Sequence, residues 1–440
     1  MRGRRIVRCL YEEGPNVTDN YHALLARREA MRLRDRLLTP ASRPGRGTGP
    51  SPGLSPATGG YDGAADQQVI VRNLAQVTPF GHLIDRLYEA MFERHPYLRK
   101  LFPDSMEFQQ VHLERALWYL IEHLHRPEDV TAFCARLGRD HRKLGVLPVH
   151  YALFEEALVE ALRRTANGEL GADVERAWLR MVRCAAAAMV DGANEALAEP
   201  TYWNGTVVDH QRRRPDLAVL RVRTAEPYPY RPGQFATLQT PLLPHTWRPY
   251  TPAGAPSADG ELEFHVRRTG PCGVSDALVT RTGVGDTLRL GPAQGTTTLD
   301  DGLTRDVLIV AGGTGWATAR ALLEDLAVRR PPGRRAQLFL GARTADDLYD
   351  APVLARLESH CAWLSVVPVI DAGPAASDRA PVTEALTGHG DFSGRTAYVS
   401  GPPGLVAAAV SRLTDLGLPA DRIRYDPVTA AIPTRPDAPT

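Results

Sequence analysis

The sequence lacks the features of a secreted, membrane-spanning or iron–sulfur protein. It has 5 cysteines in 440 residues, widely scattered and without a Cys-x-x-Cys pair, which argues against a zinc or iron–sulfur site. No apolar run is long enough to span a bilayer, and the arginine-rich start lacks the apolar core of a secretory signal. The formal net charge of +1 gives no basis for bulk binding to nucleic acid. We therefore expect a cytoplasmic protein with reduced thiols, no transmembrane segment and no nucleic-acid partner.

The first 66 residues differ in composition from the rest of the chain. Residues 22–38 have apolar side chains at helical spacing among many arginines, which predicts a basic amphipathic helix. Residues 39–60 are rich in proline, glycine and serine, as in a flexible linker. We interpret residues 1–66 as a flexible extension, while the basic helix leaves open a contact with an unknown partner.

Three folded domains are predicted to follow, so the chain is multidomain. Residues 67–198 have helical spacing throughout, which indicates an all-α domain large enough to enclose a prosthetic group. Residues 199–300 contain short β-branched segments separated by turn residues, as in a small antiparallel β-barrel or sandwich. Residues 301–430 alternate between strand and helix patterns, which predicts an α/β domain with a parallel sheet. Residues 431–440 form a tail.

A flavin site is suggested by Arg248-Pro249-Tyr250-Thr251, between two of the β-branched segments. A guanidinium can neutralise a cofactor phosphate with a planar fork of donors, and a tyrosine ring can lie against a flavin. Thr251 offers a hydroxyl and a backbone N–H to the edge of the ring. The alternative is an ordinary strand end with a structural tyrosine.

A glycine-rich turn follows the buried strand in residues 307–315 (VLIVAGGTG) and leads into a helix. Backbone N–H groups at a helix start form an anion site suited to a pyrophosphate, and glycines let the ligand approach closely. The turn is not the Gly-x-Gly-x-x-Gly dinucleotide fingerprint. The residues expected to contact a nucleotide here are Gly312, Gly313, Thr314 and Gly315.

Two further strand ends are expected at the same crevice, because ligands bind at the carboxyl ends of parallel strands. One strand ends at Arg343, which would contact the adenosine ribose or a 2′-phosphate; the alternative is a solvated surface arginine. The other is followed by Gly401 and Pro402. The choice between NADH and NADPH stays open.

Taken together and in this order, these motifs resemble those of the ferredoxin-reductase-like FAD/NAD(P)H modules. The resemblance implies that Tyr250 stacks on the isoalloxazine and that Thr251 lies near the ring nitrogen that accepts hydride. It also implies that the backbone of Gly273, Val274 and Ser275 holds the FAD pyrophosphate. The sequence departs from the family at Thr318, at Ser400 and at Val428, which replaces an aromatic residue two positions after the retained Asp426.

A histidine at a helix end, His141, is a candidate axial haem ligand, although a lone histidine is more often a surface residue. Its surroundings, with residues 87–103 (LYEAMFERHPYLRKLFP), resemble the globin domain of the flavohaemoglobin (nitric oxide dioxygenase) family. The resemblance implies that His141 is the proximal ligand and Tyr151 its hydrogen-bonding partner. On the distal side it implies that Tyr88 donates to bound oxygen and that Phe102 and Leu117 pack at the haem.

Two positions of the predicted haem pocket depart from that family. The distal glutamine position holds Leu113, although Gln109, Gln110 and His112 lie close in sequence. The proximal glutamate position holds Ala193, and Asp191 or Glu195 are the alternatives for the missing carboxylate.

The resemblance implies a flavohaemoprotein with haem b, FAD and NAD(P)H. Hydride passes from NAD(P)H to FAD, single electrons pass to the haem, and nitric oxide and O₂ are converted to nitrate. One alternative is a haem-based redox or gas sensor with an attached flavin reductase. Another is a flavin reductase whose globin binds no haem.

Overall fold

The computed structural model describes residues 62–257, 259–329, 333–370 and 381–426. The chain divides into two compact units, Met1–Pro200 and Thr201–Thr440, which are described separately. The predicted basic helix and linker of the N-terminal extension lie outside the described residues, as does Val428.

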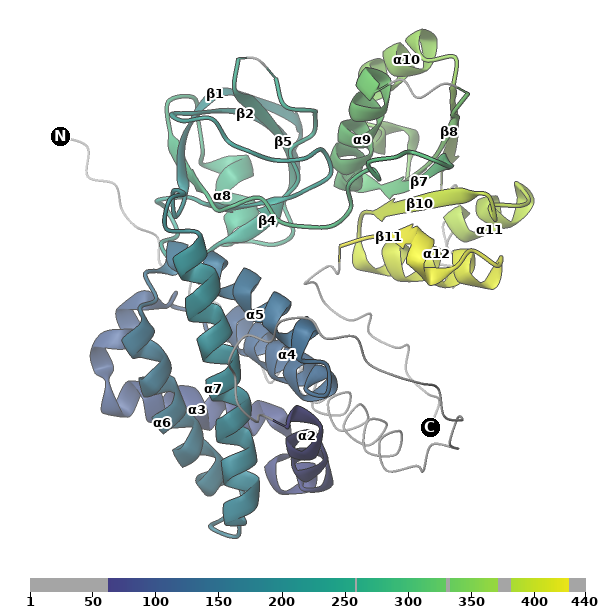
Figure 1. Cartoon of the computed structure of the whole chain (residues 1–440). Coiled ribbons are helices and arrows are strands. Elements are labelled where there is room, and N and C mark those ends of the chain that lie inside the picture. The colour runs from purple at the N-terminus through teal and green to yellow at the C-terminus, as the bar shows by residue number, and fades with distance from the viewer. Residues whose placement is uncertain (1–61, 258, 330–332, 371–380, 427–440) are drawn as a thin grey trace, which may run out of the picture. The chain divides into compact units, whose positions relative to one another are not determined.

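The first unit is helical in all its described elements (Figure 1). Its α-helices are α2 (Gly63–Arg72), α3 (Phe80–Arg94), α4 (Glu107–His123), α5 (Pro127–His141), α6 (Pro148–Thr165) and α7 (Ala172–Glu195). Short 3₁₀ turns lie between them: η1 (Leu74–Val77), η2 (Pro96–Leu101) and η3 (Arg142–Leu144).

Prolines and apolar periodicity explain these boundaries. Pro127 and Pro148 occupy the first turns of α5 and α6, where a missing N–H costs no helical hydrogen bond. In α3 the buried residues recur at three- and four-residue spacing, so one face of the helix enters the core. That core is formed mainly by α2, α3, α4, α6 and α7 around Trp178 and Phe80.

Helices α5 and α7 cross with their backbones in close approach. A Cβ atom added to Gly138 would lie 1.9 Å from the carbonyl oxygen of Met189, and one added to Gly192 would lie 2.2 Å from that of Ala135. Only glycine fits at these two places. The crossing fixes the position of the end of α5, which carries His141.

The second unit begins with an antiparallel sheet in the order β4-β3-β6-β1-β2-β5. Its strands are β1 (Trp203–Arg214), β2 (Leu217–Thr224), β3 (Ala236–Gln239), β4 (Arg248–Tyr250), β5 (Glu261–Arg267) and β6 (Thr287–Leu290). A bridge between Pro252 and Phe264 brings the two edges together, so the sheet is a nearly closed barrel. The short helix α8 (Val274–Thr280) packs on its core.

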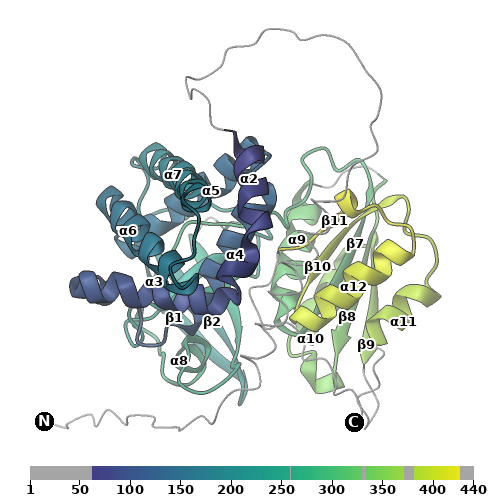
Figure 2. The ribbon, with the colours of Figure 1, turned by 90° about the horizontal axis from the view of Figure 1, so that it is seen from below.

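A parallel sheet follows, in the order β11-β10-β7-β8-β9. Its strands are β7 (Asp306–Gly312), β8 (Ala336–Ala342), β9 (Leu364–Ile370), β10 (Arg395–Ser400) and β11 (Ile423–Arg424). Figure 2 shows α9 (Trp316–Arg329) and α10 (Ala351–His360) on one side of this sheet and α11 (Pro381–Gly388) and α12 (Pro403–Asp415) on the other. Alternate residues of β7 pack into the two cores on opposite sides of the sheet. Ile309 packs into the core that includes α9 and α10, and Val310 packs into the core that includes α11 and α12.

This architecture confirms the predicted succession of an all-α domain, an antiparallel barrel and an α/β domain. The strand patterns read from the sequence fall on β1 to β3 and on β5 to β10, with ends that differ by a few residues. Helix α8 inside the barrel region was not predicted, because its seven residues are too few to show helical periodicity.

Candidate functional site

The aromatic residues expected on the distal side of a haem lie together at the start of the first unit. Tyr88 and Phe92 are on α3, and Phe102 follows η2. The ring centroids of Tyr88 and Phe102 are 5.7 Å apart at an interplanar angle of 78°, and those of Phe92 and Phe102 are 5.3 Å apart. Burial raises the pKa of Tyr88, so its hydroxyl stays protonated and able to donate at neutral pH.

Helix α4 presents a stripe of residues at four-residue spacing: Gln109, Leu113 and Leu117. Leu117 is buried in the core of the unit and Leu113 packs against the same core. Within the part of the chain that the structure describes, the buried Oε1 atom of Gln109 has no hydrogen-bond partner. A buried amide oxygen without a partner is unusual in a folded protein, and it is typical of a ligand-binding site.

His141 is the last residue of α5, and one of its two ring nitrogens makes a hydrogen bond. The Nδ1–H group donates to the carbonyl oxygen of Leu137 at 2.8 Å, so the lone pair lies on Nε2. Burial lowers the pKa of the imidazole more than the nearby Asp140 raises it, which keeps the ring neutral at pH 7. A neutral imidazole whose Nδ1–H is held by a backbone carbonyl is the usual form of an axial haem ligand.

The proximal network expected around His141 is incomplete. Tyr151 lies in the first part of α6 and packs against the core of the unit. The structure shows no hydrogen bond between Tyr151 and His141 in the described region. Asp191 and Glu195 are both exposed, so neither takes the place of the expected carboxylate. The nearest ion pair is instead the one between Asp140 and Lys143, at 2.5 Å, beside the histidine.

These observations agree with a haem held on this unit. The neutral imidazole of His141 could ligate an iron, and Tyr88 and Leu117 belong to apolar clusters that could pack against a porphyrin. Groups of three or more His, Cys, Asp and Glu that could hold a metal ion are not found among the described residues.

In the second unit, the predicted flavin motif lies on β4, at one edge of the barrel. Strand alternation turns the half-buried side chains of Arg248 and Tyr250 to one face and the exposed Pro249 to the other. Burial raises the pKa of Tyr250, so the ring is neutral, and burial lowers the pKa of Arg248. A neutral aromatic ring beside a half-buried guanidinium fits a flavin and its phosphate.

The other residues expected around FAD lie at two ends of the barrel region. Gly273 precedes α8 and a Cβ added to it would meet no atom within 4 Å, so its backbone is open to approach. Val274 is buried, and the hydroxyl of Ser275 is 3.0 Å from that of Thr269. Asp426 accepts a hydrogen bond from the backbone N–H of Thr296 at 2.7 Å.

The two predicted nucleotide loops meet at the carboxyl ends of β7 and β10. The hydroxyl of Ser400 donates to the carbonyl oxygen of Gly315 at 2.9 Å. A Cβ atom added to Gly401, whose φ is +140°, would lie 2.8 Å from the carbonyl oxygen of Gly312. Gly313 has a φ of +54° and open space at its Cβ position. The backbones of Gly312 and Gly401 are therefore in close approach, with Pro402 immediately before α12.

A small cavity lies at the end of β8, beside Gly313. Its lining includes Gly313, Trp316, Gly341, Asp347, Tyr349 and Asp350. Arg343 follows β8, and 75% of its side chain is exposed, with Nε 3.8 Å from Asp347. Arg343 can therefore reach a ligand at this edge.

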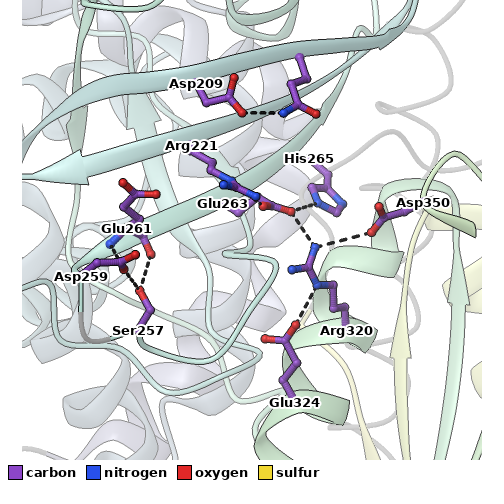
Figure 3. Close-up of polar contacts among 11 residues, drawn as sticks. Asp209, Arg221, Ser257, Asp259, Glu261, Glu263, His265, Arg320, Glu324 and Asp350 are labelled. Atoms are coloured by element: carbon purple, nitrogen blue, oxygen red, sulfur yellow. Dashed lines mark hydrogen bonds and ion pairs between the residues drawn. The ribbon is translucent and has the colours of Figure 1, made fainter. Parts of the chain in front are cut away.

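Sequence reasoning missed a group of charged residues between the barrel and the α/β part of this unit. Figure 3 shows Glu263 and His265 of β5 facing Arg320 of α9 and Asp350. These residues are far apart in the sequence and belong to no motif, so no local pattern could have identified them.

No described helix is both long and apolar enough to cross a membrane.

Comparison with known proteins assigns all three domains. Residues 85–189 match the globin family, residues 204–298 the oxidoreductase FAD-binding domain and residues 309–411 the oxidoreductase NAD-binding domain. The chain is 32% identical over 241 residues to the ferredoxin–NAD(P)⁺ reductase component of the naphthalene 1,2-dioxygenase system of Pseudomonas putida. That alignment covers 54% of this chain and 72% of the relative.

Two further comparisons extend over the globin as well. A flavohemoprotein of Chromobacterium violaceum is 24% identical over 378 residues, which is 78% of this chain and 92% of the relative. The crystal structure of a flavohemoglobin from Malassezia yamatoensis, with bound FAD and heme, shares the fold at a TM-score of 0.66 and 18% identity. It covers 82% of this chain and 98% of that one.

The chain thus combines the domains for electron transfer from NAD(P)H via FAD to haem. Its three domains are a globin domain, an oxidoreductase FAD-binding domain and an oxidoreductase NAD-binding domain, and over most of its length the chain is similar to a flavohemoprotein.

Proposed function

We propose that this protein is a nitric oxide dioxygenase that uses NAD(P)H, nitric oxide and O₂ and releases nitrate. The proposal is carried by the presence of a neutral His141 and a half-buried, protonated Tyr88 in a globin domain that is fused to oxidoreductase domains. When bound, FAD and haem supply the redox chemistry, because a flavin accepts hydride and releases single electrons.

The residues proposed to hold these groups are those predicted from the sequence. His141 would ligate the iron through Nε2, with Phe102 and Leu117 against the porphyrin. Arg248, Tyr250 and Thr251 would hold the flavin, and the backbone of Gly273, Val274 and Ser275 its pyrophosphate. The nucleotide would lie against Gly312, Gly313, Thr314, Gly315, Gly401 and Pro402.

On the distal side, we assign Tyr88 as a hydrogen-bond donor to a ligand of the haem. Its hydroxyl keeps its proton, because burial disfavours the phenolate. Gln109 is the second polar group proposed for this pocket. It lies on the same stripe of α4 as Leu113 and Leu117, and the oxygen of its amide is buried without a partner among the described residues.

The iron ligand is tested by replacing His141. His141→Ala should abolish the Soret band of the purified protein, since no described residue offers the same neutral nitrogen at the end of α5. His123→Ala is the control, because His123 makes the same hydrogen bond to the backbone of its own helix, to Tyr119, but on α4. A full Soret band in His141→Ala would contradict the assignment.

The reaction is tested by adding nitric oxide to the aerobic holoprotein during NADH oxidation. NADH consumption should accelerate, and about two nitrates should form for each NADH, since NADH supplies two electrons and each nitrate requires one. NADH oxidation that is unaffected by nitric oxide and yields no nitrate would overturn the proposal.

A haem-based sensor is the second candidate, and one observation favours it. Among the described residues no carboxylate contacts Tyr151 or the ring of His141 apart from the neighbouring Asp140. Without a carboxylate on Nδ1–H, the imidazole donates less charge to the iron. A slow spectral change with nitric oxide, with no nitrate, is the result expected of a sensor.

We also propose that Arg343 permits NADPH as well as NADH. Its exposed guanidinium lies beside Asp347, which borders the small cavity at the end of β8, and it would neutralise a 2′-phosphate there. Arg343→Ala should raise the KM for NADPH more than the KM for NADH. An equal effect on both would contradict this role.

A further inference from the structure

Arg320, on α9, lies among three carboxylates from different parts of the second unit. Its Nη1 atom is 2.7 Å from Glu263 on β5 and 3.6 Å from Asp350, and its Nε atom is 2.9 Å from Glu324 on α9. Figure 3 shows the guanidinium between these three side chains. Only 17% of the arginine side chain is exposed. We call Arg320 and its three acidic partners the Arg320 network.

On the nucleotide side, the network is connected directly to the glycine loop. Helix α9 starts at Trp316, immediately after Gly313–Gly315. The indole N–H of Trp316 donates to Asp350 at 2.8 Å, and this is the same carboxylate oxygen that Arg320 approaches one helical turn later. Asp350 itself borders the small cavity at the end of β8. Arg320 is therefore connected to the glycine loop through Asp350 and Trp316.

On the flavin side, the network reaches the segment that follows the flavin motif. The backbone N–H of Ala253 donates to the carbonyl oxygen of Glu263 at 2.7 Å. The backbone N–H of Ala255 donates to the Glu324 side chain at 3.1 Å. Both residues come within four positions of Thr251, so the partners of Arg320 also hold the backbone beside the flavin site.

The acidic partner on β5 is held in its charged form. Burial alone would raise the pKa of Glu263, but the hydrogen bond from His265 and the charge of Arg320 outweigh it and lower the pKa to about 2. Because Glu263 is a carboxylate, Nε2 of His265 donates to it at 2.9 Å, and Nδ1 accepts from the Tyr349 hydroxyl at 2.8 Å. Tyr349 also borders the small cavity at the end of β8.

A charged network of this kind makes the relative geometry of its elements well defined. Charge-assisted hydrogen bonds are short and directional, and a half-buried ion pair is favourable only when its geometry is good. Hydride transfer depends strongly on the distance between donor and acceptor, and a displacement of about 1 Å can slow a reaction by about 10²-fold.

We propose that Arg320 is a positioning residue for hydride transfer, which ties the helix behind the nucleotide glycine loop to the backbone beside the flavin motif. The inference rests on the proposed nucleotide and flavin sites, but it requires neither the haem nor nitric oxide.

The test is the rate of flavin reduction by NADH in the anaerobic full-length holoprotein, measured by stopped flow. Arg320→Met should lower the limiting rate at saturating NADH by about tenfold or more, with a larger isotope effect for NADH deuterated at the transferred position. FAD content should stay near that of the wild type, whereas Tm should fall, because three carboxylates lose their partner. Arg320→Lys should restore part of the rate, because a lysine can pair with Glu263 but cannot reach all three carboxylates.

Arg329→Met is the matched control, since Arg329 pairs with Asp325 four residues earlier on the same helix and contacts no residue of the Arg320 network. Glu263→Gln keeps the shape of the Arg320 network and removes the negative charge of Glu263. It replaces Arg320→Met in the test if that variant folds poorly. Flavin reduction in Arg320→Met or Glu263→Gln as fast as in Arg329→Met, at full FAD content, would overturn the proposal. If the wild-type protein reduces its flavin normally but forms no nitrate, that result counts against the proposed dioxygenase activity and leaves the role of Arg320 untouched.

Discussion

At the scale of single residues, Tyr88 and Gln109 are the polar groups proposed to act on a haem ligand. Both are half-buried, and both come from helices that the core of the first unit holds in place. The sequence and the family resemblance led to Tyr88, whereas Gln109 was one of several neighbours of Leu113. The structure favours Gln109, since the orphaned amide oxygen becomes visible only when the helices pack around it.

Replacing Tyr88 by Phe should leave haem content unchanged and speed the dissociation of O₂ from the ferrous protein by about tenfold. The substitution removes one hydrogen bond of about 1 kcal/mol or somewhat more in a pocket that excludes water. Flash photolysis measures the rate. Tyr97→Phe is the control, since Tyr97 is 56% exposed. Equal dissociation rates in the two variants would refute the distal role of Tyr88.

At the scale of elements, the crossing of α5 and α7 carries His141 on one of its helices. Gly138→Ala should lower the free energy of unfolding of the first unit by about 1–3 kcal/mol, because the added Cβ would meet the backbone of Met189 and α5 would have to move. The Soret band should also shift, because His141 would move together with α5. Thermal unfolding and absorption spectra measure both effects.

Gly81→Ala on α3 is the matched control for that substitution. A Cβ atom at Gly81 meets nothing within 4 Å, and alanine is favoured over glycine in a helix by about 0.5–1 kcal/mol. The variant should therefore be as stable as the wild type or slightly more stable. Gly138→Ala with unchanged stability and spectrum would show that the crossing tolerates a side chain.

The contact between β5 and α9 should make the second unit sensitive to acid. The pKa of Glu263 falls from an ordinary 4.5 to about 2 on folding, so its charge stabilises the folded state above about pH 4.5. That contribution is lost as the pH falls towards 2. The difference in free energy of unfolding between the wild type and Glu263→Gln should therefore be largest above pH 4.5 and shrink towards pH 2.

Urea unfolding at a series of pH values measures this difference. Glu261→Gln on the same strand is the control, because its partner Arg223 is 57% exposed and such surface pairs contribute little. If the difference in free energy of unfolding between the wild type and Glu263→Gln does not depend on pH, the proposed role of the carboxylate is contradicted.

At the scale of the whole molecule, the fusion joins an electron-accepting flavin unit to a haem unit. Addition of NADH to the anaerobic holoprotein should bleach the flavin band first and then shift the Soret band to its ferrous position, since electrons pass through the flavin. Tyr250→Ala should retain less FAD and slow both changes. A Soret shift that precedes flavin bleaching would contradict this order.

The sequence by itself determined the order of an all-α domain, an antiparallel barrel and an α/β domain. Strand alternation, helical spacing and loops such as residues 312–315 are local patterns, and each element forms from neighbours in the chain. The short helix α8 and the ends of the strands were less predictable, because packing decides them.

Only the tertiary structure decided which distant residues meet. Arg320 and Glu263 are 57 residues apart, and Gly138 and Met189 meet through the packing of two helices. No local pattern marks such pairs, because a charged side chain or a glycine looks the same in sequence whether it is exposed or enclosed. Their partners depend on strand order and helix crossing, which long-range packing determines.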